Sequence, residues 1–169
     1  MKPARYAFLA GLAVALVFAP AGCKRKASSG QMLSVVRMGD PNAEGQLSGF
    51  YGIEASAWRW TKQNFSVVLA PPAGAAEKGA WLRVKVTAPD GLIAKLGAVT
   101  LAASVAGQPL GAETYSAAGA YTYEREVASQ FLQGKYAKVD FALDKAMPPA
   151  GGDVRELGIV VVSAGLEPK

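Results

Sequence analysis

The 169-residue sequence contains no histidine and only one cysteine. Without histidine, the chain cannot build a Ser-His-Asp or Cys-His catalytic site, and it has no imidazole ligand for zinc. A single cysteine cannot close an internal disulfide or supply the thiolate cluster of a structural zinc site. The stability of the fold must therefore come from packing, and several classes of enzyme and metal site are excluded.

An excess of charge of one sign is also missing from most of the chain. The sequence has 18 Lys and Arg against 13 Asp and Glu, but five of the cations and none of the anions precede Gly30. This leaves 13 cations against 13 anions after Gly30. A protein that binds nucleic acid carries a basic face on its folded domain, so we expect no nucleic-acid partner.

The N-terminus has the layout of a secretory signal peptide. Lys2 and Arg5 precede an apolar run from Tyr6 to Phe18. A positively charged start followed by a short apolar run is typical of such signals. The run is shorter than the roughly 20 apolar residues that a helix needs to cross a bilayer. We therefore expect a signal peptide over residues 1–22.

The single cysteine directly follows this signal. Pro20-Ala21-Gly22-Cys23 resembles the lipobox of bacterial lipoproteins, in which small residues precede a cysteine that is diacylated and becomes the mature N-terminus. Pro20 departs from the aliphatic residue usual there, and Ala19-Pro20-Ala21 can also be interpreted as an ordinary Ala-x-Ala cleavage site. Acylation would consume an otherwise lone reactive thiol. We expect Cys23 to be lipidated and to attach the protein to a membrane.

A tether is expected after the attachment point. Residues 23–32 have the small and polar composition of a flexible linker, and Lys24-Arg25-Lys26 gives it a basic start. The residue that follows the cysteine is Lys24 rather than Asp, and in this respect the sequence resembles lipoproteins that are delivered to the outer membrane. The expected location is the cell envelope, at the periplasmic face of the outer membrane.

Residues 33–169 show the alternation of β-strands. Leu82, Val84 and Val86 share one face of a strand, and Arg83 and Lys85 share the other. Proline and glycine turn signals separate such runs, and only two short stretches, 91–96 and 128–133, are expected to form helical turns. This pattern predicts a single all-β, antiparallel sandwich domain. The other expected strands are Phe65–Leu69, Val99–Val105, Tyr121–Val127, Val139–Leu143 and Ile159–Val162.

Several motifs in this domain resemble a known module. They are Phe50-Tyr51-Gly52-Ile53-Glu54, Trp58-Arg59-Trp60-Thr61, Val139-Asp140-Phe141 and the segment Asp153–Ile159. Together they resemble a small jelly-roll sandwich that looks like a carbohydrate-binding module, occurs in bacterial lipoproteins and is also found beside glycosyltransferases. The resemblance implies a jelly roll and a polysaccharide partner. A jelly roll does not by itself determine function.

Three tryptophans are the candidate glycan-binding residues. Trp58 and Trp60 lie two positions apart, so on a strand they project from the same face, and the indole surface suits the apolar face of a sugar ring. The alternative is that at least one of them packs into the core. Trp81 falls on the polar side of its strand, with Arg83 and Lys85, and is a candidate exposed neighbour of the pair.

The charged residues of the motifs are expected to be structural. Glu54, Arg59, Asp153, Arg155 and Glu156 flank hydrophobic segments, where ion pairs would hold loops or strand ends. Glu124 and Glu126 share a strand face roughly 7 Å apart, a spacing found in glycosidases, but acidic residues are also common on strand surfaces. We expect no catalytic residues, no metal and no cofactor.

Two functions remain open from the sequence. The first is a membrane-anchored envelope lipoprotein whose non-catalytic sandwich binds a glycan through aromatic and polar side chains. The second is an interaction or scaffold lipoprotein that binds an envelope protein through an apolar patch or a sheet edge. Exposure of the tryptophans would distinguish the two.

Overall fold

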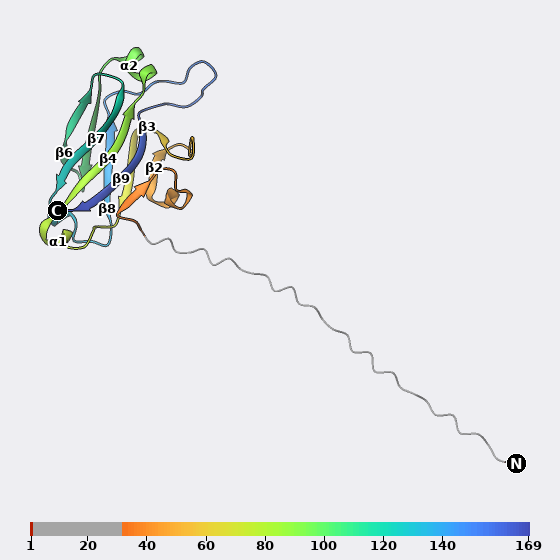
Figure 1. The fold of residues 1–169 in the computed structure, drawn as a ribbon, viewed down its shortest axis with the longest axis vertical. Helices are drawn as coiled ribbons and strands as arrows, with labels where there is room; N and C mark the ends of the chain where they lie inside the picture. Colours follow the sequence, from red (N-terminus) through yellow and green to blue (C-terminus); the bar gives the residue numbers. More distant parts are fainter. Residues whose placement is uncertain (2–31) are drawn as a thin grey trace.

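The computed structural model describes Met1 and residues 32–169, so Cys23 and nearly all of the expected signal and tether lie outside the described residues. Nine strands dominate the described part, with two short α-helices and two 3-10 turns between them (Figure 1). The strands are β1 (Val35–Arg37), β2 (Leu47–Phe50), β3 (Arg59–Leu69), β4 (Ala80–Ala88), β5 (Val99–Val105), β6 (Gln108–Tyr115), β7 (Gly119–Val127), β8 (Ala137–Leu143) and β9 (Val160–Pro168). The helical elements are η1 (Pro41–Gln46), α1 (Ala75–Lys78), α2 (Asp90–Leu96) and η2 (Ser129–Phe131).

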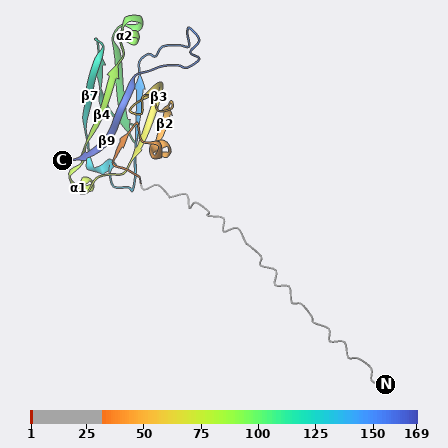
Figure 2. The same cartoon turned by 45° about the vertical axis from the view of Figure 1, so that its right-hand side comes forward.

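The strands form two layers. In the first, sheet A, the order is β1-β9-β4-β7, and β9, β4 and β7 lie side by side in Figures 1 and 2. In the second, sheet B, the order is β2-β3-β8-β5-β6. Every pairing is antiparallel. Apart from β2, this strand order is that of a jelly roll, which confirms the predicted fold class.

Strand β3 belongs to both sheets. Arg59 and Trp60 pair with Val161 and Val160 of β9 in sheet A, whereas Asn64–Leu69 pair with β8 in sheet B. The outward-facing side chains of this one strand therefore run from the outer face of sheet A to the outer face of sheet B.

The core lies between the sheets and follows the predicted alternation. Leu82, Val84 and Val86 are buried, as are the inward residues of β5 and β8. Phe65 and Phe141 stack across β3 and β8, with ring centroids 4.9 Å apart. Burial of these side chains stabilises the fold by about 1.5 to 3 kcal/mol for each large apolar group, which supplies stability without a disulfide.

Both predicted helical turns are confirmed, as α2 and η2, but the expectation of only two is wrong, because η1 and α1 are helical as well. The expected strand at Phe65–Leu69 is only the second half of the 11-residue β3. Strands β1, β2 and β6 were not anticipated, because they are short or mostly exposed and lack a clear apolar alternation. Among the described residues, no helix has the length and hydropathy of a membrane span.

Candidate functional site

An open groove crosses the outer face of sheet B. One row of residues aligned in register runs across all five strands and forms its floor. Four interstrand spacings make this row about 19 Å long, which suits an elongated ligand. From β2 to β6 the row consists of Ser48, Ser66, Asp140, Ser104 and Pro109.

A second row lies beside the first and explains why the face is hollow. Asn64 on β3 is aligned with Ala142 on β8, Ala102 on β5 and Ala112 on β6. Serine and alanine side chains leave a volume of about 450 Å³ open above the sheet. The groove is therefore a consequence of small residues at outward positions of neighbouring strands.

The floor of the groove is backed by rigid packing. Phe65 and Phe141, directly below it, have only 4% and 3% of their surface exposed. Phe50 packs edge-on against Phe65, with centroids 5.2 Å apart. Because both rings of the stack point inward, a ligand in the groove would meet hydroxyl, amide and charged groups and small apolar side chains rather than an aromatic face.

One ion pair supplies the charge of the groove. The Lys138 ammonium lies 2.6 Å from the Asp140 carboxylate, and both side chains are about half exposed. Asp140 can accept hydrogen bonds from ligand hydroxyls, Lys138 can donate them, and the Asn64 amide can do both. The arrangement suits a neutral polyhydroxyl ligand.

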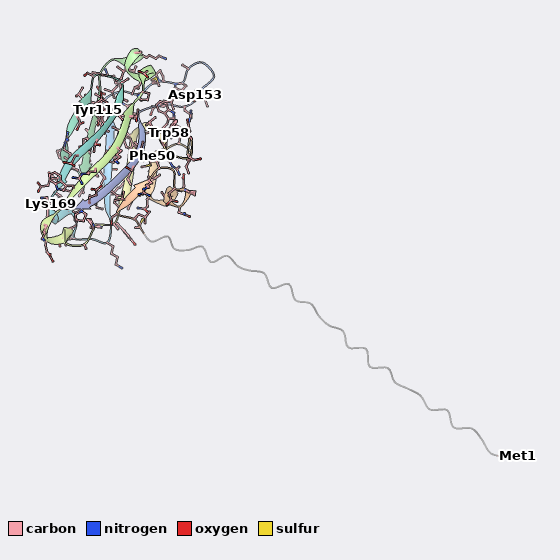
Figure 3. The ribbon with its side chains drawn as sticks, in the orientation of Figure 1. Met1, Phe50, Trp58, Tyr115, Asp153 and Lys169 are labelled. Atoms are coloured by element: carbon pink, nitrogen blue, oxygen red, sulfur yellow. The ribbon has the colours of Figure 1, made fainter. Side chains whose placement is uncertain are left out.

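The tryptophan pair lies on the other sheet. Trp58 and Trp60 are each half-buried, and Arg59 between them points inward. Their ring centroids are 6.2 Å apart, but the ring planes meet at 81°. The two indoles therefore share a face, as their spacing predicts, yet they do not form a parallel two-ring platform. Figure 3 labels Trp58 beside the loop that carries Asp153.

Trp81 is far from this pair. In the register of sheet A, Trp60 is aligned with Val160 and Thr87, whereas Trp81 is aligned with Glu167. Trp81 and Thr87 are six positions apart on β4, which corresponds to about 20 Å. The Lys169 ammonium lies 5.9 Å from the centroid of the half-buried Trp81 ring. The expectation that Trp81 neighbours Trp58 and Trp60 is therefore wrong.

Three of the charged residues that were expected to be structural, Glu54, Asp153 and Arg155, form one cluster. Arg155 bridges Glu54, at 2.8 Å, and Asp153, at 2.9 Å. Its guanidinium also lies 5.3 Å from the centroid of the Tyr51 ring. Hydrogen bonds from Arg155 lower the pKa of the Asp153 carboxyl. The cluster holds the long β8–β9 loop against the segment before β3.

The other two charged residues, Arg59 and Glu156, lie outside this cluster. Arg59 pairs with Glu44 of η1, a residue that the sequence did not single out. Glu156 instead accepts a hydrogen bond from the backbone N–H of Gln63, at 2.8 Å, and so acts as a strand-edge acceptor.

The paired carboxylates of β7 do not resemble a glycosidase site. Glu124 binds Arg83 and Glu126 binds Lys169, and both carboxylates are exposed. No group of histidine, cysteine or acidic residues in the described part of the chain is arranged to hold a metal ion.

The comparisons with known proteins concern structure alone. No family model matches the sequence, and no curated protein does. The CBM36-1 domain of a multidomain xylanase from the hindgut metagenome of Trinervitermes trinervoides is 11% identical, with a TM-score of 0.35, over 60% of this chain and 69% of that domain. A CBM4 structure is 10% identical, with a TM-score of 0.38, over 80% of this chain and 85% of the other.

An acetyl xylan esterase, Est2A, from the rumen bacterium Butyrivibrio proteoclasticus is also similar in fold. It is 11% identical, with a TM-score of 0.45, but the match covers 80% of this chain and only 32% of the esterase. The CBM36 and CBM4 structures are carbohydrate-binding modules, the class that the sequence resembles. At such identities and TM-scores, none of the three decides the ligand of this chain.

Sequence reasoning missed the groove residues. Ser48, Ser66, Ser104 and Asn64 lie on three different strands, β2, β3 and β5, and only the strand register brings them together. Asp140 was noted solely as part of a motif. The one available signal was the run of small or polar residues at the outward positions of β5 and β8 and at Asn64 and Ser66 of β3.

Proposed function

We propose that the protein is a lipid-anchored protein of the cell envelope whose jelly roll binds a polysaccharide without cleaving it. The observation that carries the glycan-binding part is the 450 Å³ groove on sheet B, which is open at the surface and in which hydroxyl, amide and charged groups lie among alanine, proline and phenylalanine residues. Polysaccharides present closely spaced hydroxyls along an extended chain, and such a row of donors and acceptors can bind them through hydrogen bonds.

The anchoring part rests on the sequence around Cys23. A signal peptide followed by small residues and a single cysteine supports acylation, and the basic tether that follows suits a position near a membrane surface. The outer membrane is the proposed location because Lys24 follows the cysteine. Mass spectrometry of the mature N-terminus tests this part, and an unmodified Gly22 as first residue would contradict it.

Groove filling tests the glycan-binding part. Ala142 is exposed on the groove floor, and Ala120 is an exposed strand alanine on the outer face of sheet A. In affinity electrophoresis with envelope and extracellular glycans, we expect Ala142→Trp to lose the retardation that the wild type shows. Ala120→Trp is the matched control and should be retarded like the wild type, and both variants should melt near the wild-type temperature.

A charge variant gives a second comparison within the same segment. Lys138 lines the groove, and Lys135, three residues earlier, is an exposed lysine outside it. We expect Lys138→Ala to weaken glycan binding and Lys135→Ala to leave it unchanged. If Trp58→Ala or Trp60→Ala abolishes binding while Ala142→Trp does not, the glycan binds at the tryptophan pair. If no glycan retards the wild type, the protein-interaction function replaces glycan binding.

A further inference from the structure

A second hollow lies on the outer face of sheet A, where the described chain begins. It has a volume of about 590 Å³ and lies between β1, β9, β4 and the segment at Ser56 and Ala57. Its charged and polar lining consists of Arg37, Lys85, Asp40, Ser56 and Ser163. We call this hollow the β1 groove. It lies on the opposite sheet from the groove to which we assign the glycan.

A bulge in β9 shapes the floor of the β1 groove. Lys85 is aligned with Ser163 and Val86 with Val161, so Val162 is an extra residue opposite β4. A bulge places two consecutive side chains on the same side of a sheet. Val162 and Ser163 accordingly both line the groove, and Val162 is 38% exposed.

Two cations flank this bulge. Arg37 and Lys85 are both aligned with Ser163, one on each side of β9, so their backbones are about 10 Å apart. Within residues 32–169, neither forms an ion pair, whereas the other four arginines all bind carboxylates. Asp40, the acidic residue of the groove, accepts two hydrogen bonds from Asn42. Two long cationic side chains and the Ser163 hydroxyl can thus converge on one phosphate group.

Exposed aliphatic side chains surround the cations. Leu33, Val35 and Arg37 project from the same face of the chain, since each is exposed and the residues between them are not. Leu33 is 38% exposed and Val35 is 42% exposed. Together with Val162, they are three of the few large apolar side chains that the described part leaves exposed. Aliphatic groups beside cations are the combination by which proteins bind an anionic membrane surface.

The wall of the groove is fixed before any ligand binds. Ala55 and Ser56 both adopt the left-handed backbone conformation, with φ of 47° and 55°. Such a conformation persists in residues other than glycine only where the surrounding structure holds it. A Cβ on Gly39 would lie 2.3 Å from the carbonyl oxygen of Ser56, so the segment packs directly on the turn after β1.

We propose that the β1 groove is a docking site for the surface of an anionic phospholipid bilayer, with a lipid phosphate between Arg37 and Lys85. This inference rests on the proposed lipid anchor. About ten residues join Cys23 to Leu33, and a fully extended chain of that length spans at most about 36 Å. The anchor would therefore keep this face close to the bilayer. The tether gives the groove a high effective concentration at the bilayer surface, so even a weak contact forms.

The test uses the mature protein reconstituted in vesicles. Acylation leaves no free thiol, so an introduced cysteine takes a single fluorescent label. Val162→Cys places the label in the β1 groove, and Ala112→Cys places it on the outer face of sheet B as the control. On phosphatidylglycerol vesicles, we expect acrylamide quenching of the Val162 label to fall about threefold relative to phosphatidylcholine vesicles, since the label is shielded at the bilayer surface.

Charge variants identify the groove as the cause. Neutralising Arg37 and Lys85 together, as Arg37→Gln and Lys85→Gln, should restore quenching to the phosphatidylcholine level. The matched control is the pair Lys95→Gln and Lys135→Gln, which removes the same charge from exposed positions elsewhere and should keep the protection. Salt of about 1 M should also restore quenching, because the Debye length then falls to about 3 Å.

The remaining outcomes separate this inference from the proposals on which it rests. If the protein floats with both kinds of vesicle but the Val162 label is quenched equally on the two, the docking site is overturned and the lipid anchor is not. If Cys23 takes a second label and the protein does not float with vesicles, the lipid anchor and the docking site are both overturned. Protection of the Val162 label by a soluble anionic polysaccharide without vesicles would assign the groove to a glycan and overturn the inference.

Discussion

Arg59 and Glu44 form an ion pair whose two ends lie in different environments. The Arg59 side chain is 2% exposed, whereas the Glu44 side chain is 73% exposed, and their atoms are 2.7 Å apart. Arg59 also donates hydrogen bonds to the backbone carbonyls of Met38 and Tyr51. This one side chain therefore joins the segment after β1, the turn η1 and the segment before β3.

We expect the two partners to contribute unequally to stability. Glu44→Gln should lower the free energy of unfolding by about 1 kcal/mol or less, because water screens the exposed carboxylate. Arg59→Met should lower it by about 3 kcal/mol, because the buried carbonyl of Met38 and the part-buried carbonyl of Tyr51 lose their donor. Urea denaturation of both variants measures the difference, and equal losses would contradict this explanation.

Tyr115 and Tyr123 form a matched pair for a second stability test. The Tyr115 hydroxyl is buried without a hydrogen-bond partner among the described residues, whereas the Tyr123 hydroxyl donates to the carbonyl of Gly111. Removing an unpaired buried hydroxyl relieves a desolvation cost of about 1 to 3 kcal/mol. Tyr115→Phe should therefore raise the melting temperature and Tyr123→Phe should lower it. A lower melting temperature for Tyr115→Phe would show that its hydroxyl has a partner in solution.

The same two tyrosines should make the fold sensitive to alkali. Burial raises the pKa of both hydroxyls, that of Tyr123 from 10.0 to about 12. Below pH 10 the two tyrosine hydroxyls are protonated in both the folded and the unfolded protein, so the protein has its full stability. Between pH 10 and 12 the unfolded state loses these protons first, so stability falls as the pH rises. Urea midpoints measured across this range should fall less steeply in the Tyr115→Phe Tyr123→Phe double variant, and an unchanged slope would contradict the assignment.

A carboxyl titration tests the cluster on the β8–β9 loop. Hydrogen bonds from Arg155 lower the pKa of Asp153 from its ordinary value of 3.8. By NMR, the Asp153 carboxyl should titrate below that value in the wild type and return toward it in Arg155→Gln. Hydrogen exchange of the loop around residues 150–157 should become faster in the same variant. If Asp153 titrates normally in the wild type, the ion pair is not formed in solution.

The sequence predicted the fold class because alternation of apolar residues reports directly on burial in a sheet. Leu82, Val84 and Val86 are buried as expected, and the absence of long helical patterns correctly excluded other architectures. Strands such as β1 could not be predicted in this way. Val35 is exposed although apolar, and β1 is defined by its pairing with β9 rather than by its own composition.

The candidate site depended on register, which a single sequence does not specify. The same-face position of Trp58 and Trp60 follows from spacing within one strand, whereas their edge-to-face angle and the remoteness of Trp81 depend on side-chain packing and on pairing with β9. Likewise, Ser66 and Ser104 become neighbours of Asp140 only through β8. Chemistry assembled across strands is visible only once the sheet order is known.

The most direct test of the proposed function is an NMR titration of a soluble form beginning at Gly30 with oligosaccharides from envelope and extracellular glycans. One experiment reports on both candidate surfaces, through the backbone amides of Ser66, Ser104 and Asp140 and through the indole N–H groups of Trp58 and Trp60. We expect saturable shifts of the three groove amides, with little change at the indoles, and no saturable shifts in Ala142→Trp. Shifts confined to the indoles, or no saturable shift with any glycan, would contradict polysaccharide binding in the groove of sheet B.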